Sequence, residues 1–222
     1  VETSRKFYEI LKANYTHVTF NVIETLTELD EIALLRPDLV VTCVKYLYEA
    51  SSGTEIWLSE FFSERGIAHT GSSRETLKFD SDKSSAKRAV IAAGLPTAGF
   101  FIATPQTFRR VNQLPLSFPL FVKPMDAANG NGIDENSLVH DFTSYLLKLD
   151  EIFETYGNSA LVEEYLTGRE FTVAVLDDPK NNRRLISPVE IIVPANKNGD
   201  RILGGLEKSE NNEILGMVIE PE

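Results

Sequence analysis

The sequence predicts an α/β chain that changes to α+β in its C-terminal half. In the first part of the chain, helical patterns alternate with short apolar segments, which is typical of a parallel sheet covered by helices. After residue 158, three strand-like segments follow one another with only turn-rich connections, and such short connections require antiparallel pairing. The chain has 222 residues, of which 42% are hydrophobic, and this is enough for one large or two small domains.

The composition argues against several classes of protein. The net charge is −11 and the 22 basic residues are scattered, whereas nucleic-acid and anionic-membrane surfaces need a basic patch. No apolar run approaches the length of a membrane span, and the start of the chain has no signal-peptide pattern. The single cysteine, Cys43, excludes an internal disulfide and fits a reducing compartment. We therefore expect a cytoplasmic protein that binds neither nucleic acid nor a membrane.

The first segment, residues 1–75, is expected to form an incomplete parallel α/β unit. Apolar residues at helical spacing predict a helix over residues 2–14, and a second helical pattern covers residues 24–35. Residues 17–22 alternate like a strand, and residues 38–44 have the pattern of a short, fully apolar strand. The unit lacks an opening strand and the chain ends in an acidic, irregular tail, so we expect it to be a piece of a longer protein.

A further helix start is predicted within this segment. Residues 52–55, Ser-Gly-Thr-Glu, fit a capping box, in which a hydroxyl and a carboxylate bind free backbone N–H groups at the start of a helix. Gly66 is expected to end this helix. The residues that it is predicted to pack are Ile56, Trp57, Leu58, Phe61 and Phe62.

The middle of the chain continues the alternation with different content. Asp82 is a candidate N-cap for a helix that runs through Ala93 and ends at Gly94. The segment FPLFVK, residues 118–123, is expected to be a strand. Residues 141–153 are strongly amphipathic and predict a helix. The apolar residues at helical spacing in it are Phe142, Tyr145, Leu146, Leu149, Ile152 and Phe153.

The last part of the chain predicts an antiparallel sheet. Its expected strands are ALVEEYL at residues 160–166, EFTVAVLD at residues 170–177 and LISPVEIIV at residues 185–193. The connections TGR and DDPKNNRR are rich in turn residues and leave no room for a helix.

Lys123 and the loop after it are the first candidate for chemistry. An apolar strand ends on Lys123, Pro124 stops the strand, and Gly130 and Gly132 allow the backbone N–H groups to turn toward an anion. The alternative is a lysine that extends its ammonium to solvent from an ordinary turn. The glycine spacing matches neither the P-loop nor the dinucleotide fingerprint. The combination predicts an anionic ligand, such as a nucleotide phosphate, against both the lysine and the loop.

Three glutamates form the second candidate. Glu163 and Glu164 are adjacent on a predicted strand, so their side chains point to opposite faces and cannot form an acid–base dyad. One interpretation is a solvated and a paired glutamate. The other is a strand that runs into a linker, where backbone groups bind the edge of a base and Glu170 binds ribose hydroxyls.

Lys83 is the third candidate, because it opens a predicted helix where the helix dipole disfavours a cation. A shared polyphosphate would explain it, although an exposed lysine is favoured from the position alone. His17, His69 and His140 have no metal-ligand spacing to one another or to Cys43. No Ser/His/Asp or Cys/His grouping is present, so we assign no catalytic or metal-binding residue.

In this order, the motifs resemble those of ATP-grasp enzymes of the D-alanine–D-alanine ligase group. The resemblance covers most of residues 66–178, and the combination is more specific than any single motif. The matching segments are GIAHTGSS at 66–73, SDKSSAKRAVIAAGLPTAGFF at 81–101, FPLFVKP at 118–124 and ALVEEYLTGREFTVAVL at 160–176.

The resemblance implies a division of the chain. Residues 1–75 would be a partial Rossmann-like domain that precedes the ATP-grasp domain, and residues 76–222 would be the ATP-grasp domain itself. Its first subdomain, 76–165, would be a mixed α/β unit, and its second, 166–222, an antiparallel sheet. ATP would bind between these subdomains, together with Mg²⁺.

The resemblance also implies roles for individual residues. Lys83 and Lys123 would contact phosphates, and a further lysine, to which Lys208 is the nearest match, would face them. Adenine would be bound by Glu163 and by the backbone of Glu164 and Leu166. The remaining expected nucleotide-binding residues are Tyr165 beside the adenine, Glu170 at the ribose, and Asn129, Gly130 and Gly132 in the glycine-rich loop.

The chemistry implied by the resemblance needs no protein nucleophile. ATP would phosphorylate a small carboxylate, and an amine would attack the acyl phosphate to give an amide or peptide bond, ADP and phosphate. Such catalysis consists mainly of positioning and of neutralising the phosphate charge. Amino acids are the expected carboxylate and amine, and a homodimer is the expected assembly.

Three departures from the family pattern narrow these expectations. The loop MDAANGNG, residues 125–132, replaces the serines of the family, with Asn129 near the usual substrate-side serine. The histidine- and acid-containing loop of the family has no match in VKYLYEASSGTE, residues 44–55. We therefore expect D-alanine to be a poor substrate. The metal-binding carboxylates and asparagine of the family lie beyond the match, so these 222 residues are expected not to assemble the Mg²⁺ site.

Two other classes of function stay open from the sequence. One is a regulatory or degenerate nucleotide-binding module without ligase activity. The other is an interaction domain in which every lysine above is structural. ATP-dependent thermal stabilisation separates the second from the nucleotide binders, because a ligand that binds only the native state raises its stability.

Overall fold

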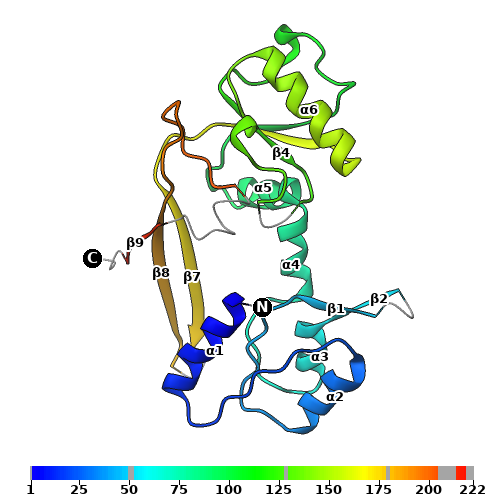
Figure 1. The fold of residues 1–222 in the computed structure, drawn as a ribbon, viewed down its shortest axis with the longest axis vertical. Coiled ribbons are helices and arrows are strands. Elements are labelled where there is room, and N and C mark those ends of the chain that lie inside the picture. Colours follow the sequence, from blue (N-terminus) through cyan, green and yellow to red (C-terminus); the bar gives the residue numbers. More distant parts are fainter. Residues whose placement is uncertain (1, 50–52, 128–129, 179–180, 205–213, 219–222) are drawn as a thin grey trace. The chain divides into compact units, whose positions relative to one another are not determined.

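The computed structural model describes residues 2–49, 53–127, 130–178, 181–204 and 214–218. The chain divides into two compact units, residues 1–79 and residues 80–222 (Figure 1). The fold class is confirmed as a mixed α/β architecture with several antiparallel sheets. No helix in the described ranges is long and apolar enough to cross a membrane.

The first unit is built from helices around a small core. The helices predicted at residues 2–14 and 24–35 are confirmed as α1 (Glu2–Asn14) and α2 (Leu26–Leu34). Thr25 opens α2 with a capping box, because its hydroxyl accepts from the N–H of Glu28 while the Glu28 carboxylate binds the N–H of Thr25. The other elements are β1 (Tyr46–Glu49), β2 (Thr54–Trp57), α3 (Leu58–Glu64) and α4 (Arg74–Ser81), whose last two residues belong to the second unit. The core residues are Leu29, Ala33, Leu58, Phe61, Phe62 and Ile67.

Two strands expected in this unit do not form. Residues 17–22 have no strand structure, and within residues 38–44 only Val40 makes a single parallel bridge, to His69. Over the described part of the unit, the remaining pairing is the antiparallel hairpin of β1 and β2. Local alternation of apolar residues was therefore not sufficient, since a strand also needs a partner for its backbone groups.

The predicted capping box at residues 52–55 is also wrong. Thr54 and Glu55 belong to β2, where they pair with Glu49 and Tyr48 of β1, and the helix begins only at Leu58. The Glu55 carboxylate accepts a hydrogen bond from the indole N–H of Trp57 at 3.2 Å instead of capping a helix. The predicted helix end is confirmed, because Gly66 follows α3 with a φ of +65°.

The second unit begins with α5 and a four-stranded antiparallel sheet. The strand order is β3-β6-β4-β5, so β6 lies in the centre beside both β3 and β4. The predicted helices at 82–93 and 141–153 and the predicted strand at 118–123 are confirmed as α5, α6 and β4. The bounds are α5 (Lys83–Ala92), β3 (Phe100–Ala103), β4 (Leu120–Pro124), β5 (Leu138–Val139), α6 (Phe142–Tyr156) and β6 (Ala160–Glu164), with short 3-10 turns at Val111–Gln113 and Glu135–Ser137.

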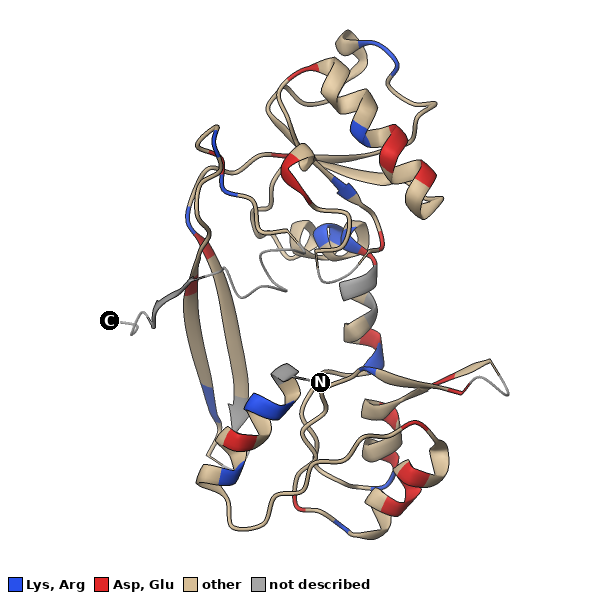
Figure 2. Ribbon diagram, in the orientation of Figure 1, with Lys and Arg blue, Asp and Glu red and all other residues tan. Residues whose placement is uncertain are grey.

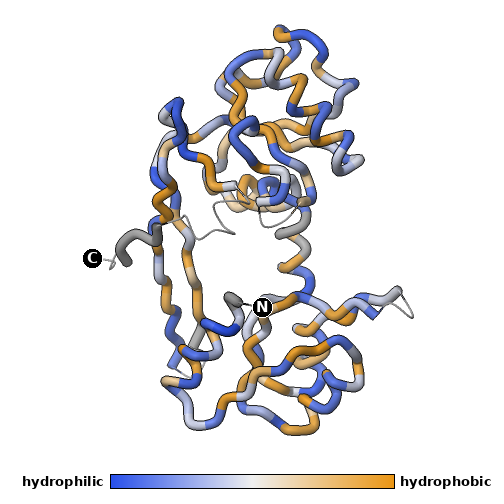
Figure 3. Tube along the Cα trace, viewed as in Figure 1, coloured by the Kyte–Doolittle hydropathy of each residue, from blue (hydrophilic) through white to orange (hydrophobic). Residues whose placement is uncertain are grey.

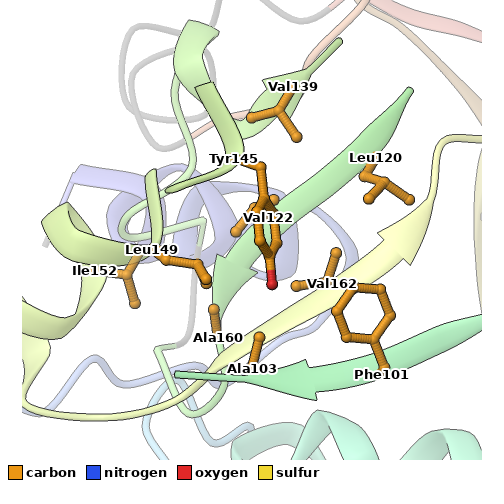
Figure 4. Packing of buried hydrophobic residues seen from close by; sticks show 10 residues of the cluster. All are labelled: Phe101, Ala103, Leu120, Val122, Val139, Tyr145, Leu149, Ile152, Ala160 and Val162. Atoms are coloured by element: carbon orange, nitrogen blue, oxygen red, sulfur yellow. The ribbon is translucent and has the colours of Figure 1, made fainter. Parts of the chain in front are cut away.

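Helix α6 packs against one face of this sheet and forms the main core. Tyr145 of α6 points toward Val122 and Val162 (Figure 4). Asp141 starts α6 with a capping box, and Gly157 ends it in the left-handed region, with a φ of +65°. The buried cluster consists of Phe101, Ala103, Leu120, Val122, Val139, Tyr145, Leu149, Ile152, Ala160 and Val162.

The last strands form a separate three-stranded antiparallel sheet in the order β7-β8-β9. Its strands are β7 (Glu170–Asp178), β8 (Arg183–Ile192) and β9 (Ile214–Val218). The antiparallel pairing of the segments at 170–177 and 185–193 is confirmed. The expectation that residues 160–166 join the same sheet is wrong, because β6 pairs with β3 and β4. Apolar residues recur along β7 and β8 (Figure 3).

Candidate functional site

The four-stranded sheet has two different faces. Leu120 and Val122 of β4 are buried in the core beside α6, whereas Phe121 and Lys123 point to the opposite face because successive side chains of a strand alternate. Glu163 of β6 pairs directly with Phe121, so Glu163 shares the face of Lys123. We call this surface the site face; its residues are Phe100, Ile102, Phe121, Lys123, Leu161 and Glu163.

Three charged side chains meet on the site face. The Glu163 carboxylate forms ion pairs through one oxygen with Lys87 at 2.6 Å and through the other oxygen with Lys123. The exposed fractions of the side chains are 12% for Lys87, 20% for Lys123 and 11% for Glu163. Burial opposes ionisation of Glu163, but the two ammonium groups outweigh it and hold the pKa of this carboxyl below its ordinary value.

Lys87 is fixed by further contacts. Its ammonium donates a hydrogen bond to the hydroxyl of Thr97 at 2.8 Å and lies 5.3 Å from the ring centroid of Phe100. Lys123 lies in a similar way 5.9 Å from the ring centroid of Phe121. The basic positions on α5 and β4 are coloured blue in Figure 2. Each ammonium therefore has an aromatic ring and a carboxylate as neighbours.

Lys83, at the first position of α5, contacts the segment that follows β4. Its ammonium donates to the carbonyl oxygens of Pro124 at 3.2 Å, Met125 at 3.3 Å and Ala127 at 2.5 Å. Asp82 caps the helix and accepts a hydrogen bond from the N–H of Ser85, and the hydrogen bonds from Ser85 and Ser84 lower the pKa of Asp82 to about 2. The structure thus brings Lys83 next to the residues that follow Lys123.

The glycine-rich loop is shaped by packing within the unit. Gly130 and Gly132 have φ values of +80° and +74°, which favour glycine. A Cβ at Gly132 would lie 2.4 Å from Cγ of Pro124 and 3.0 Å from Cε2 of Tyr156. Gly132 is therefore required for this close approach, whether or not a ligand is bound. Asn129, predicted in the same loop, lies outside the described residues, as does Lys208.

The linker after β6 holds the other predicted residues. Glu164 exchanges hydrogen bonds with Gly99, because its N–H donates to the Gly99 carbonyl at 2.9 Å and its carboxylate accepts from the Gly99 N–H at 3.2 Å. The ring of Tyr165 stacks on Phe121 with a centroid distance of 6.3 Å, and its hydroxyl donates to the carbonyl of Arg201 at 3.1 Å. Leu166 and Glu170 are exposed.

Comparisons with known proteins show which proteins this chain is similar to. A family model described as the D-ala D-ala ligase C-terminus matches residues 90–198, which include β3, β4, β6 and the site face. The chain is therefore similar to ATP-grasp proteins of the D-alanine–D-alanine ligase group, as its motifs predicted.

Curated ligases of this group match the chain over part of their length. The D-alanine–D-alanine ligase of Granulibacter bethesdensis is 31% identical over 154 residues, which are 67% of this chain and 46% of that protein. The ligase of Hydrogenovibrio crunogenus is 32% identical over 111 residues, 50% of this chain and 34% of that protein. The chain thus spans less than half of the length of these two relatives.

Solved structures of the same ligase group share the fold. The D-alanine–D-alanine ligase of Bacillus anthracis has a TM-score of 0.56 at 20% identity, and the match covers 95% of this chain and 63% of the ligase chain. Its complex with ATP has a TM-score of 0.55 at 22% identity, with 88% of this chain and 57% of the other covered. The similarity extends beyond the residues that the family model matches.

A metal site of the ligase group is not seen in the described part of the chain. No group of three or more His, Cys, Asp or Glu residues in these ranges is arranged to hold a metal ion. His69 bonds to the carbonyl of Ser59 at 2.9 Å, and His140 lies 3.8 Å from the carboxylate of Asp200. The described residues therefore do not fit Mg²⁺ by themselves, and we assign them no step through it.

Sequence reasoning did not identify Lys87. A signal was present, because Lys83 and Lys87 are four residues apart and thus lie on the same side of a predicted helix. What the sequence could not supply was the acceptor, since Glu163 is far away along the chain. The structure joins Lys87, Lys123 and Glu163 directly and leaves Glu170 and Leu166 exposed at the linker.

Proposed function

We propose that this chain is the ATP-binding part of an ATP-grasp ligase that joins a small carboxylate to an amine through an acyl phosphate, with release of ADP and phosphate. The observation that carries the proposal is the cluster of Lys87, Glu163 and Lys123 on the site face, with Lys83 at the adjoining turn. The chain's match to the D-alanine–D-alanine ligase group supports the same reaction class.

The phosphates of ATP are proposed to lie at the turn after β4. Lys123 is the penultimate residue of β4, and Lys83 bonds to the carbonyl oxygens of Pro124 and Met125. Lys83 therefore contacts the turn that begins directly after Lys123. Phosphoryl transfer is promoted mainly by charge neutralisation and alignment, which such a pair supplies to the transferred phosphate without a protein nucleophile.

The adenine is proposed to lie at residues 163–166. The Glu163 carboxylate is held ionised and is acceptor-only in that state, so it suits an exocyclic amino group as a donor. Phe121 and Tyr165 present stacked rings beside it. Glu170, at the start of β7, is the proposed ligand of the ribose hydroxyls.

Binding of ATP is tested by calorimetric titration of the unaltered chain and of Lys123→Ala. Loss of a charge-assisted contact should weaken binding by about 1.5–3 kcal/mol. Arg88→Ala is the matched control, since it removes an exposed cation from α5 and should leave the affinity unchanged. Equal affinity of the unaltered chain and Lys123→Ala would remove Lys123 from the site.

The reaction is tested by phosphate release with a panel of amino acids. The whole protein should form ADP and phosphate only when both a carboxylate and an amine are present. D-alanine alone should be a poor substrate, because the segment of residues 125–132 replaces the serines of the family loop. Robust turnover of D-alanine would contradict this specificity. ATP binding without phosphate release on any substrate would instead indicate a regulatory module.

A further inference from the structure

Lys87 contacts Glu163 in the cluster, but the proposed function assigns no step of nucleotide binding to Lys87. Each oxygen of the Glu163 carboxylate is paired with a different lysine, Lys87 at 2.6 Å and Lys123 on the other side. All three side chains are largely buried. Two ammonium groups and one carboxylate leave the cluster with one net positive charge, which suits an incoming anion.

An incoming phosphate changes the balance within this cluster. If Lys123 turns toward a phosphate, Glu163 loses one of its two counter-charges. A buried carboxylate without a partner is strongly unfavourable, so it has to keep another cation or take up a proton. Lys87 can remain in place, because Thr97 and the ring of Phe100 hold it independently of Lys123.

We propose that Lys87 is a positioning residue of the nucleotide site: it keeps Glu163 ionised and so allows Lys123 to exchange its contact with Glu163 for a contact with the phosphates. This inference rests on the proposed function, because it requires that ATP binds at the site face. It assigns Lys87 no contact with the nucleotide.

The groups around Glu163 support this division of roles. Lys87 faces it from α5 and Lys123 from β4, while Phe100 of β3 and Phe121 of β4 flank it without charge. The neighbouring carboxylate, Glu164, points to the other face of the strand and accepts from the N–H of Gly99, so it does not compete for these lysines. Removing Lys87 should therefore leave Glu163 dependent on Lys123 alone.

The test is calorimetric titration with ATP of the unaltered chain, Lys87→Met, Lys87→Arg and Arg88→Met. Lys87→Met should weaken binding about tenfold, the size of a lost charge-assisted contact, and Lys87→Arg should restore most of the affinity. Arg88→Met, the matched control on the exposed side of α5, should bind like the unaltered chain.

Two readouts separate this role from a merely structural one. Titration in buffers of different ionisation enthalpy should show that Lys87→Met takes up a proton when it binds ATP. Lys87→Arg and the unaltered chain should bind ATP without proton uptake. In the Glu163→Gln background, which has no carboxylate to hold, Lys87→Met should change the affinity by no more than about twofold. If Lys87→Met does not fold, Thr97→Val loosens the same lysine and should also cause proton uptake.

The outcomes are distinguishable. No ATP binding by the unaltered chain would overturn this inference together with the proposed function. Loss of binding in Lys123→Ala, with normal affinity and no proton uptake in Lys87→Met, would overturn this inference alone. Equal losses from Lys87→Met in the unaltered chain and in the Glu163→Gln background would also overturn it, because they would indicate a structural effect.

Discussion

The two sheets of the second unit differ in how their apolar residues are packed. In the four-stranded sheet, Leu120, Val122 and Val162 are each 0% exposed. In the three-stranded sheet, Leu176 is 61% and Leu185 60% exposed. Lys123 and Glu163 of the candidate site are on the four-stranded sheet, where packing against the core fixes the backbone that carries them.

The difference follows from the order of residues along the strands. In β4, core residues alternate with Phe121 and Lys123, so one face packs on α6 and the other carries the site. In β7, apolar residues occur on both faces, for example Val175 and Leu176 at adjacent positions. Strands with two apolar faces are typical of sheets that are covered on both sides. Because Lys123 and Glu163 lie in β4 and β6, the packing of the four-stranded sheet is expected to determine the stability of the site.

The largest expected effect is from shortening a leucine in each sheet. Leu120→Ala should lower the free energy of unfolding by about 2–5 kcal/mol, because it leaves a cavity in a packed core. Leu185→Ala, at an exposed position of β8, should cost less than about 1 kcal/mol. Urea unfolding followed by circular dichroism measures both. Equal losses would show that the second sheet is packed as tightly as the first.

A second comparison uses two glycines. Gly132→Ala should cost about 2 kcal/mol or more, since the new methyl group meets Pro124 at 2.4 Å and the φ of +74° disfavours alanine. Gly168→Ala is the control, because a Cβ at Gly168 would have no neighbouring atom within 4 Å. Gly168 lies in the linker between β6 and β7. It should be neutral in the same unfolding measurement. Destabilisation by both would contradict a special packing of Gly132.

A smaller effect is expected at the start of α5, which carries Lys83 and Lys87. Asp82→Ala removes the N-cap and should cost about 1 kcal/mol, while Asp82→Asn keeps a capping oxygen. Because the pKa of Asp82 is lowered to about 2 on folding, its contribution is present above its unfolded pKa and is lost as the pH falls through about 2. Thermal unfolding from pH 7 to acid should show this loss in the unaltered chain but not in Asp82→Asn.

The smallest effect is expected at Tyr145, in the core between α6 and the four-stranded sheet. Its hydroxyl is buried without a hydrogen-bond partner among the described residues, and burial raises the pKa of Tyr145 to about 12. Tyr145→Phe removes an unsatisfied group and should be neutral or slightly stabilising, within about 1 kcal/mol. A clear loss of stability in the same urea experiment would reveal a partner for the hydroxyl.

The sequence predicted those elements whose signals are local. The helix α6 has a capping residue, Asp141, and apolar residues at helical spacing, and both features act within the same segment. The Ser-Gly-Thr-Glu pattern at residues 52–55 led to a wrong prediction of a helix start, because a capping box and a hairpin strand compete for the same backbone groups. In the structure Thr54 pairs with Glu49 in the hairpin, and the four-residue pattern carries no information about this pairing.

Partners far along the chain were the main source of error. A strand was predicted at residues 160–166 and is observed as β6 (Ala160–Glu164), but its place between β3 and β4 depends on pairing with distant residues. For the same reason Lys87 was overlooked although its spacing from Lys83 was visible. Lys123 and Glu163 were identified only as separate candidates, and their direct ion pair emerged from the structure.

The most direct test of the central claim is a crystal structure of the chain with a non-hydrolysable ATP analogue. We predict adenine at residues 163–166, phosphates against Lys83 and Lys123, and Glu163 still paired with Lys87. The analogue bound away from the site face, or Lys123 still paired with Glu163 and distant from the phosphates, would contradict it.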